Sequence, residues 1–441
     1  MHSPPINTDY SKLFQEFESG LNGERRSPLH KRRVQGIKEF AQTGFPSTAQ
    51  EDWRFTDVSP IAHAQFRTVA RADQGALDEK TVRGLLADEK HPRLVFENGH
   101  FRQDLSRLPK NSGVTVKSLL QAGYEHPERL EAYAAQLAPV TLNGFVALNT
   151  AFMYDGAFID IADSAVLDSP LYVVYYSTKM DGQAAVFPRN LILVGRHARA
   201  TVVEHYASSD EHRYFNNAVS EIYQDQNSFL NHIKIQHESD SAYHTELTKV
   251  QQERHSVYKS HVFSFGSLLA RSDIQVQLNG EGAQALLNGL YLSGGRSLVD
   301  HHTLIDHAAP HSSSREHYKG ILDGQARAVF SGKIHVRQHA QKTDARQSNE
   351  NLILSQNAVV DSKPQLEIFA DDVRCTHGST VGQMDKDGLF YLRSRGLPLA
   401  AARNLMTRAF AGEITEQIQN DQERQALENR VDSKLSKGHL L

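Results

Sequence analysis

A single thiol stands two residues before an imidazole in the stretch DDVRCTHGSTVGQ, residues 371–383. Cys375 is the only cysteine among 441 residues, and His377 is its near neighbour. If this stretch is a strand, both side chains lie on one face, because alternate residues of a strand share a face. The imidazole could then help to ionise the thiol for nucleophilic chemistry, or both groups could bind a metal. Alternatively, Cys375 is an inert buried residue beside a surface histidine.

The number of thiols limits the metal option. Zinc and iron–sulfur sites usually need three or four ligands, and clusters use mostly thiolates. This chain cannot supply four thiolates, so the missing ligands would come from another chain or from a mobile segment. We therefore expect any cluster site on Cys375 and His377 to be shared at a subunit interface. A histidine-rich stretch at 301–317 matches no standard zinc spacing.

Composition and charge are ordinary for a globular protein. Hydrophobic residues make up 39% of the chain and the net charge is −4, which argues against a basic nucleic-acid surface. The longest strongly apolar run, 171–176, is far shorter than the roughly 20 residues that cross a bilayer. The first residues lack the pattern of a signal peptide. We expect a cytoplasmic protein that binds neither nucleic acid nor membrane.

Periodicity divides the chain into three regions. Residues 1–144 are mostly helical in pattern, with apolar residues such as Tyr10, Leu13 and Phe14 on one helix face. Residues 145–383 alternate apolar and polar positions in short segments, such as DIQVQLNG, which is typical of strands. The helical period returns in 384–441. The chain is therefore predicted to be helical, then β, then helical.

Aspartate and glycine residues predict the ends of the C-terminal helices. Asp385 can cap a helix that ends at Gly396, and Gly412 is expected to end the next helix.

The β region is compatible with a sandwich, a barrel or a β-solenoid. We favour the solenoid, because the region exceeds 200 residues and its turns, such as SGGRS and LDGQA, are polar and irregular. Stacked coils tolerate such turns, since only their strands need to stay in register. The open ends of such a stack must be capped or paired with a partner.

Signatures of several enzyme classes are absent. The sequence contains no G-x-x-x-x-G-K-[ST] phosphate loop, so the chain is not expected to hydrolyse ATP itself. It also contains no G-x-S-x-G elbow of a serine hydrolase. Neither of these two reactions is therefore expected of this chain.

Several longer stretches resemble one protein family. ADDVRCTHGSTVGQMDKDGLFYLRSRGL (370–397) is similar to the C-terminal signature of the SufB/SufD family, whose members are subunits of the SUF iron–sulfur cluster assembly scaffold. EDWRFTD (51–57), FVALNTAFMYDGAFIDI (145–161) and ARAVFSGKIHVRQHAQKTDARQSNENLILS (326–355) show the same resemblance. SufB-type members carry E-H-E where this chain has CTHG, and they use additional cysteines. Gly378 and the lone thiol therefore resemble the SufD type.

The resemblance implies a fold and partners. The family fold is a right-handed parallel β-helix between N-terminal and C-terminal helical regions. A member is a scaffold subunit rather than an enzyme, and it works in a complex with a SufB-like sister subunit and an ABC-type ATPase, SufC. Positions matching Cys375 and His377 face the interface between the sister subunits, where a nascent cluster is thought to form. His377 is then a ligand or ligand-positioning group, and Cys375 a ligand or a sulfur-handling thiol. No tightly bound cofactor is expected in the isolated chain.

The C-terminal helices carry a second implied site. Residues 385–410 resemble the region that docks the ATPase, and Leu405, Met406 and Phe410 form an apolar stripe within it. This stripe is either the docking face or part of the core of the chain itself, because amphipathic helices usually face their own core.

Three alternatives remain open. The chain could be a purely structural subunit, with Cys375 inert and the sister supplying every ligand. It could also be a carbohydrate-active enzyme, since β-solenoids house polysaccharide lyases. When its partner is absent, the chain could form a homodimer through its exposed β-helix surface.

Overall fold

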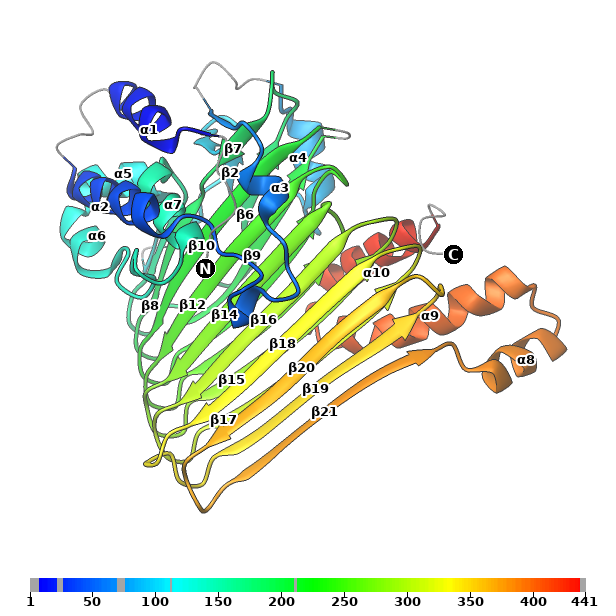
Figure 1. The fold of residues 1–441 in the computed structure, drawn as a ribbon. Helices are drawn as coiled ribbons and strands as arrows, with labels where there is room; N and C mark the ends of the chain where they lie inside the picture. The colour runs from blue at the N-terminus through cyan, green and yellow to red at the C-terminus, as the bar shows by residue number, and fades with distance from the viewer. Residues whose placement is uncertain (1–7, 22–26, 70–75, 112, 210–211, 437–441) are drawn as a thin grey trace.

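The computed structural model describes residues 8–21, 27–69, 76–111, 113–209 and 212–436. Two sheets face each other, and the chain passes from one to the other for about eight turns. Figure 1 shows this stack running from the N-terminal helices to β21 at its far edge. The β-solenoid predicted from period-two patterning is confirmed, as are the helices on either side of it.

The strands of the solenoid alternate between the two sheets in chain order. The first sheet contains β4 (Val114–Ser118), β5 (Ala157–Ile161), β8 (Arg189–Val194), β10 (Tyr214–Gln224), β12 (Tyr243–Gln252), β14 (Leu269–Leu278), β16 (Leu298–His307), β18 (Arg327–Val336) and β20 (Val359–Ile368), with β1 (Arg67–Thr68) and β7 (Ala184–Val186) beside them. The second contains β2 (Arg93–Glu97), β3 (His100–Phe101), β6 (Leu171–Ser177), β9 (Arg199–Ser208), β11 (Phe229–His237), β13 (Val257–Ser264), β15 (Gln284–Ser293), β17 (Ser313–Leu322), β19 (Asp344–Ile353) and β21 (Arg374–Gln383). Among the strands that the structure describes, only the β2–β3 and β4–β5 pairs are antiparallel.

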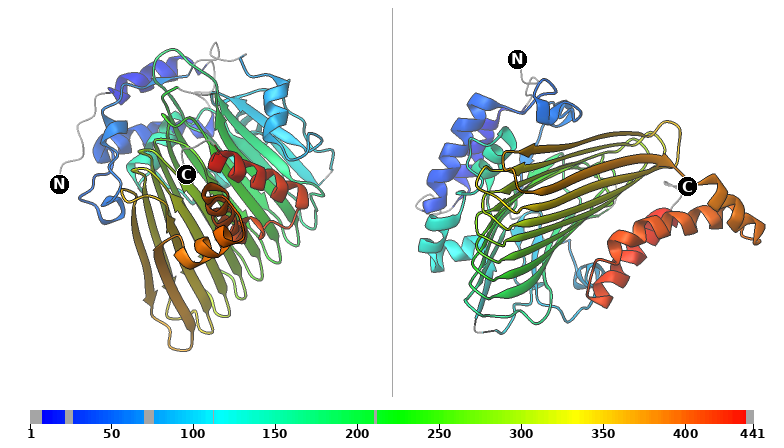
Figure 2. Two further views of the ribbon diagram at one scale, coloured as in Figure 1. Left: turned by 90° about the vertical axis from the view of Figure 1, so that its right-hand side faces the viewer. Right: turned by 90° about the horizontal axis from the view of Figure 1, so that it is seen from below.

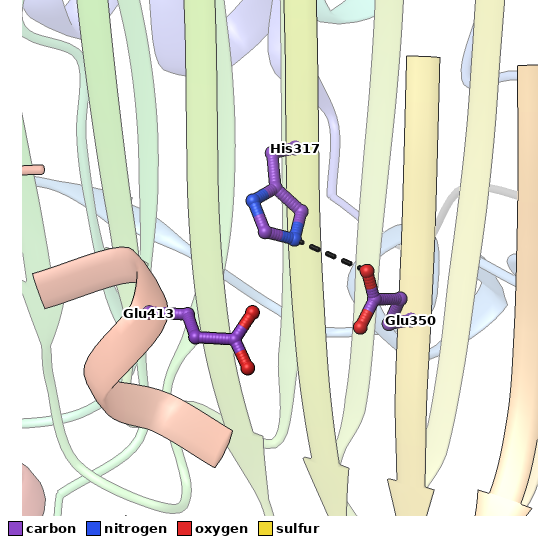
Figure 3. Close-up of side chains that lie close together, drawn as sticks. All are labelled: His317, Glu350 and Glu413. Atoms are coloured by element: carbon purple, nitrogen blue, oxygen red, sulfur yellow. Dashed lines mark ion pairs between the residues drawn. The ribbon is translucent and has the colours of Figure 1, made fainter. Parts of the chain in front are cut away.

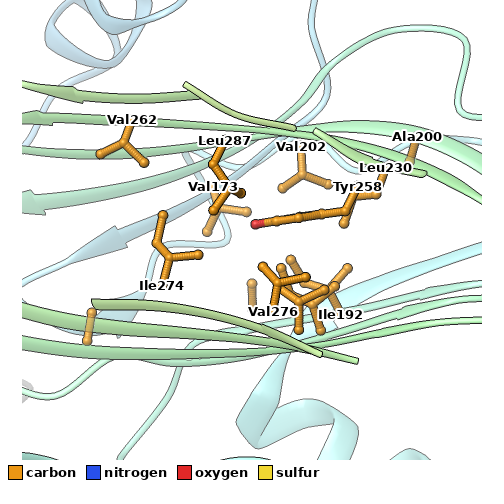
Figure 4. Packing of buried hydrophobic residues seen from close by; sticks show 14 of the residues in the cluster. Val173, Ile192, Ala200, Val202, Leu230, Tyr258, Val262, Ile274, Val276 and Leu287 are labelled. Atoms are coloured by element: carbon orange, nitrogen blue, oxygen red, sulfur yellow. The ribbon is translucent and has the colours of Figure 1, made fainter. Parts of the chain in front are cut away.

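An apolar core fills the space between the two sheets. Figure 4 shows Val202, Leu230 and Tyr258 from one sheet facing Ile274 and Val276 from the other. These positions come from the alternating pattern, because one row of each strand points inward and the other outward. Burial of this continuous core stabilises coils that could not bury an apolar face alone.

The interior also holds buried ion pairs. His232 Nε2 lies 3.0 Å from Glu204 Oε1, and Lys234 Nζ lies 2.5 Å from Glu246 Oε2. Burial alone would raise the pKa of Glu204, but the charges of Lys234 and His232 lower it to about 2. His232 and Lys234 of β11 therefore face the interior rather than water. Their charges must be paired there, because an isolated buried charge is costly.

The turns at one corner of the solenoid have a repeated backbone conformation. His197, Asn227 and His255 have φ of 59°, 57° and 56°, in the left-handed region. Each of these residues donates its backbone N–H to a carbonyl of the following coil, at 2.9 to 3.0 Å. This ladder offsets the cost of a left-handed conformation in residues other than glycine. It explains how irregular turn sequences can stack without an exact repeat.

The N-terminal helices cover the outer face of the first sheet (Figure 2). They are α1 (Tyr10–Ser19), α2 (Pro28–Thr43), the 3-10 helix η2 (Glu51–Trp53), α3 (Ser59–Ala62), α5 (Leu119–Glu125), α6 (Pro127–Tyr133) and α7 (Gly144–Phe152). The remaining helix, α4 (Glu79–Leu85), packs through Val82 against the second sheet instead. Because α7 is a buried helix, the strands that follow it begin at Ala157 rather than near residue 145.

The C-terminal region forms α8 (Lys386–Ser394), α9 (Leu399–Thr415) and α10 (Asp421–Ser436). As predicted, the Asp385 side chain caps α8, and Gly396 follows its end with φ of 92°. The expectation that Gly412 ends the next helix is wrong, since α9 continues to Thr415. Ile414 is fully buried against the second sheet, and this packing outweighs the roughly 1 kcal/mol that a helical glycine costs. Among the residues that the structure describes, no helix is long and apolar enough to cross a membrane.

Candidate functional site

The solenoid ends in two strands that each have a neighbour on one side only. Within the described part of the chain, β20 pairs with β18 alone and β21 with β19 alone. Most residues of β21 are exposed, in contrast to the strands before it. The interior of the β-helix therefore opens between β20 and β21, and we call this opening the mouth.

Cys375 lies on β21 with its side chain turned into the mouth. It pairs with the buried Ala345 of β19 and packs against an apolar cluster that includes Ile334 and Leu366. Burial raises the pKa of the Cys375 thiol above its ordinary value, and the nearby Asp344 carboxylate adds to this effect. Because the thiolate is the nucleophile and metal ligand, this thiol is held in its less reactive form.

His377 follows on the same strand and shares the inward face with Cys375. It is exposed, because no further coil covers β21. The predicted strand and the predicted shared face are therefore both present. The two side chains differ in environment, however, since Cys375 contacts apolar neighbours whereas His377 is open to solvent.

Hydroxyl groups bridge the two strands of the mouth. Ser379 of β21 donates a hydrogen bond of 2.7 Å from its Oγ to Oγ of Ser362 on β20. Ser362 in turn donates to Oδ1 of Asn349, at 2.9 Å, one coil deeper. The mouth therefore has an apolar end at Cys375 and a polar end at Ser379, and His377 lies between them.

The three predicted docking residues of α9 have different surroundings. Leu405 is 47% exposed. Met406 is partly buried, and a Cβ added at Gly388 of α8 would lie 3.2 Å from its Cε atom. Phe410 is also partly buried and lies under the ammonium of Lys319, which is 4.3 Å from its ring centre. Of the three, Leu405 is the most exposed and therefore the most available to a partner.

Two exposed aromatic residues on α8 were not identified from the sequence. Phe390 is 74% exposed and Tyr391 is 56% exposed. A sequence signal existed, because the segment GLFYLRS has too many large apolar residues for one buried stripe. Figures 1 and 2 show α8 projecting beyond the end of the solenoid, close to the side on which β21 ends.

A histidine and two glutamates meet where α9 contacts the second sheet (Figure 3). Ligand atoms of His317, Glu350 and Glu413 all lie within 4.8 Å of one another. The ammonium of Lys319 already occupies this group, at 3.2 Å from Glu350 Oε2 and 2.7 Å from Glu413 Oε2. A cation in this position repels a metal ion, so we interpret the cluster as an ionic anchor for α9.

The N-terminal segment 51–57 reaches β20, one of the two strands that form the mouth. The guanidinium of Arg271 stacks on Trp53, 3.6 Å from its ring centre. Glu51 Oε1 accepts a hydrogen bond of 2.5 Å from Lys363 Nζ on β20. This segment therefore supports the outer face of an edge strand. Sequence analysis identified EDWRFTD as a motif but not its position, because the contact joins residues 312 positions apart.

Comparisons with known proteins cover almost the whole chain. Residues 5–173 match the SufBD protein N-terminal region, and residues 175–410 match the SufBD core domain of the SUF system for FeS cluster assembly. An iron–sulfur cluster assembly SufBD family protein of Synechocystis is 34% identical over 95% of this chain and 93% of its own length.

Two proteins named iron–sulfur cluster assembly protein SufD are also similar. The Escherichia coli protein is 30% identical over 94% of this chain and 95% of its own length. The Bacillus subtilis protein is 24% identical over 92% and 94%, respectively. With both family regions matched and these relatives aligned from end to end, the chain belongs to the SufBD family of iron–sulfur cluster assembly proteins and is SufD-like.

Proposed function

We propose that this chain is a cytoplasmic, non-ATPase scaffold subunit that builds and transfers nascent iron–sulfur clusters together with a SufB-like sister and a SufC-like ABC ATPase. The observation that supports this role best is the mouth, where β20 and β21 each have one free edge and β21 carries Cys375 and His377. A free strand edge presents unpaired N–H and C=O groups that another strand can satisfy. A sister subunit that pairs with β20 and β21 would enclose both side chains in the shared interface.

The cluster is cargo in this proposal, and the chain supplies only part of its ligands. Cys375 is the single thiol, so the sister must provide the others. His377 can offer one imidazole nitrogen to iron without rearrangement, because it is exposed. Cys375 must leave its apolar cluster and lose its proton before it binds iron or accepts sulfur. A bound cation favours this loss.

The packing of α9 suggests how the ATPase acts on the mouth. α9 lies against β17, while the exposed Phe390, Tyr391 and Leu405 are free to contact the ATPase. Two ATPase subunits that dimerise on binding ATP would move α8 and α9 of this chain. Because α9 is anchored to the solenoid through Lys319, this movement would reach the last coils and open the interface at Cys375 and His377.

The direct test is the native mass of the tagged chain, purified from its own cells with everything it retains. We expect one sister subunit and two ATPase copies. A Val381→Lys variant, at an exposed position on β21, should lose the sister, whereas Tyr124→Lys, exposed far from the mouth, should keep it. A chain recovered alone or as a homodimer through the same free edges, under conditions that preserve such complexes, would contradict the proposal.

Two rival functions predict different results. A purely structural subunit would tolerate Cys375→Ser and His377→Ala with full cluster assembly, because its sister would supply every ligand. A carbohydrate-active enzyme would degrade an acidic polysaccharide, which a scaffold would not. The match to both SufBD family regions favours the scaffold over the enzyme.

A further inference from the structure

A column of polar side chains continues inward from His377. His377 pairs with Gln347 in the register of β21 and β19, and Gln347 pairs with Glu316 in the register of β19 and β17. Paired residues of parallel strands lie about 4.8 Å apart on the same face of a sheet. Gln347 is therefore directly behind His377, and Glu316 is one coil deeper.

The amide of Gln347 has a fixed orientation. Its Nε2 donates a hydrogen bond of 2.7 Å to Oε2 of Glu316, whose carboxyl group is buried. Burial raises the pKa of Glu316 to about 7, so above that pH it is a carboxylate, which accepts hydrogen bonds and does not donate them. Nε2 rather than Oε1 of Gln347 must then face Glu316. Gly332 of β18 makes room for this arrangement, since a Cβ there would lie 2.1 Å from Gln347 Nε2.

The other end of that amide has no partner. Gln347 Oε1 is buried and has no hydrogen-bond partner among the described residues. A buried acceptor left unpaired costs free energy. His377 lies in the neighbouring position of the column and can supply a donor, because a neutral imidazole carries one N–H and one unprotonated nitrogen.

From this column we infer that Gln347 is a positioning residue for His377: its Oε1 accepts the ring N–H of His377 and leaves the other ring nitrogen free to bind cargo. Glu316 acts indirectly, because its hydrogen bond to Nε2 keeps the Gln347 amide from turning over. Metal-binding histidines commonly donate their second nitrogen to a carbonyl or carboxylate, which fixes the tautomer and the ring orientation. Gln347 would supply this fixed acceptor within the chain, before any partner is bound.

The inference rests on the proposed role of His377, but its test does not depend on cluster assembly. Ring nitrogen shifts of 15N-labelled histidine would be measured in the full-length chain at about pH 8.5, above the ordinary histidine pKa. The His377 signals would be assigned as those missing from a His377→Gln sample. We expect one clearly protonated and one clearly unprotonated nitrogen, which is the signature of a single tautomer. Averaged shifts, as in a free imidazole, would overturn the inference.

Two variants separate positioning from mere packing. Gln347→Met keeps the length of the side chain but removes the acceptor, so both His377 nitrogen shifts should move toward their mean. Glu316→Gln offers Gln347 a donor as well as an acceptor, so the amide can turn over and the two His377 shifts should move part of the way toward their mean. Unchanged shifts in a folded Gln347→Met chain would contradict the inference. If Gln347→Met does not fold, the unmodified chain alone still gives the decisive result.

The results also distinguish this inference from the proposed function. A fixed tautomer together with full cluster assembly by His377→Ala would support the positioning contact and reject the role of His377 in assembly. Averaged shifts together with lost assembly by His377→Ala would support that role and reject Gln347 as its positioning residue.

Discussion

The ammonium of Lys319 lies 4.3 Å from the centre of the Phe410 ring, so a strand of the β-helix is joined to α9 by a cation–π contact. The same ammonium is 2.7 Å from Glu413 Oε2, one helical turn further along. The Lys319 side chain is almost fully buried, whereas that of Glu413 is largely exposed. Phe410 is therefore expected to contribute more to this anchor than the ion pair, which water partly screens.

Phe410→Ala should detach α9 from the solenoid. Loss of the apolar contact and the cation–π contact should lower the free energy of unfolding by about 2 kcal/mol. The loss should be visible as faster amide hydrogen exchange in α9, with little change in β12 to β16. Phe390→Ala is the matched control, because this ring is exposed on α8. Equal protection of α9 in both variants would show that Phe410 is not an anchor.

Exposed apolar residues of α8 and α9 should bind the ATPase. Phe390→Ser combined with Leu405→Ser should abolish retention of the ATPase on the tagged chain and leave the sister subunit bound. Removing two exposed anchors from an interface typically costs at least about 2 kcal/mol, or roughly thirtyfold in affinity. Tyr124→Ser removes an equally exposed ring elsewhere and should have no effect. Retention of the ATPase by the double variant would rule out this surface.

The thiol of Cys375 should react slowly in the folded chain. Burial raises its pKa, so less thiolate is present at pH 8 than in the unfolded chain, and the apolar cluster also limits access. Alkylation by iodoacetamide should be several-fold slower than in urea and should accelerate as the pH rises, because more thiolate forms. A Val381→Cys chain in a Cys375→Ser background places an exposed thiol on the same strand and should react at the unfolded rate. Equal rates for the two folded chains would contradict the sequestered thiol.

Glu316 should make stability depend on pH. Burial raises its pKa from 4.5 to about 7, so the folded chain keeps a proton that the unfolded chain loses near pH 4.5. Its contribution is therefore fully present below pH 4.5 and is lost as the pH rises through 7. Glu316→Gln cannot ionise, so its stability relative to the unmodified chain should increase over this window by up to about 3 kcal/mol. Urea unfolding at several pH values measures the difference, and a constant difference would show that Glu316 does not titrate there.

Much of this architecture follows from local sequence pattern. Alternation over 145–383 predicted the strands, and the Cys375–His377 spacing predicted their shared face, because both depend only on the two-residue period. The ends of α8 followed from Asp385 and Gly396, whose roles are local. The prediction that Gly412 ends α9 was wrong, because the end of this helix depends on the long-range burial of Ile414 rather than on local sequence.

The surroundings of the site could not be predicted in this way. Cys375 packs against Ile334 and Ala345, which come from earlier coils. The column of Gln347 and Glu316 behind His377 depends on coil length, because one residue more or less per turn would place other side chains there. No exact repeat in the sequence reveals this length.

The most direct test of the central claim is cluster assembly in cells that depend on this chain. His377→Ala should lower the activity of cluster-dependent enzymes by about tenfold or more, in line with the loss of a metal ligand or its orientation. His339→Ala is the matched control, since it removes an exposed histidine from the turn between β18 and β19. Full activity of His377→Ala, at the same protein level as the control, would contradict the assignment of the mouth as the cluster site.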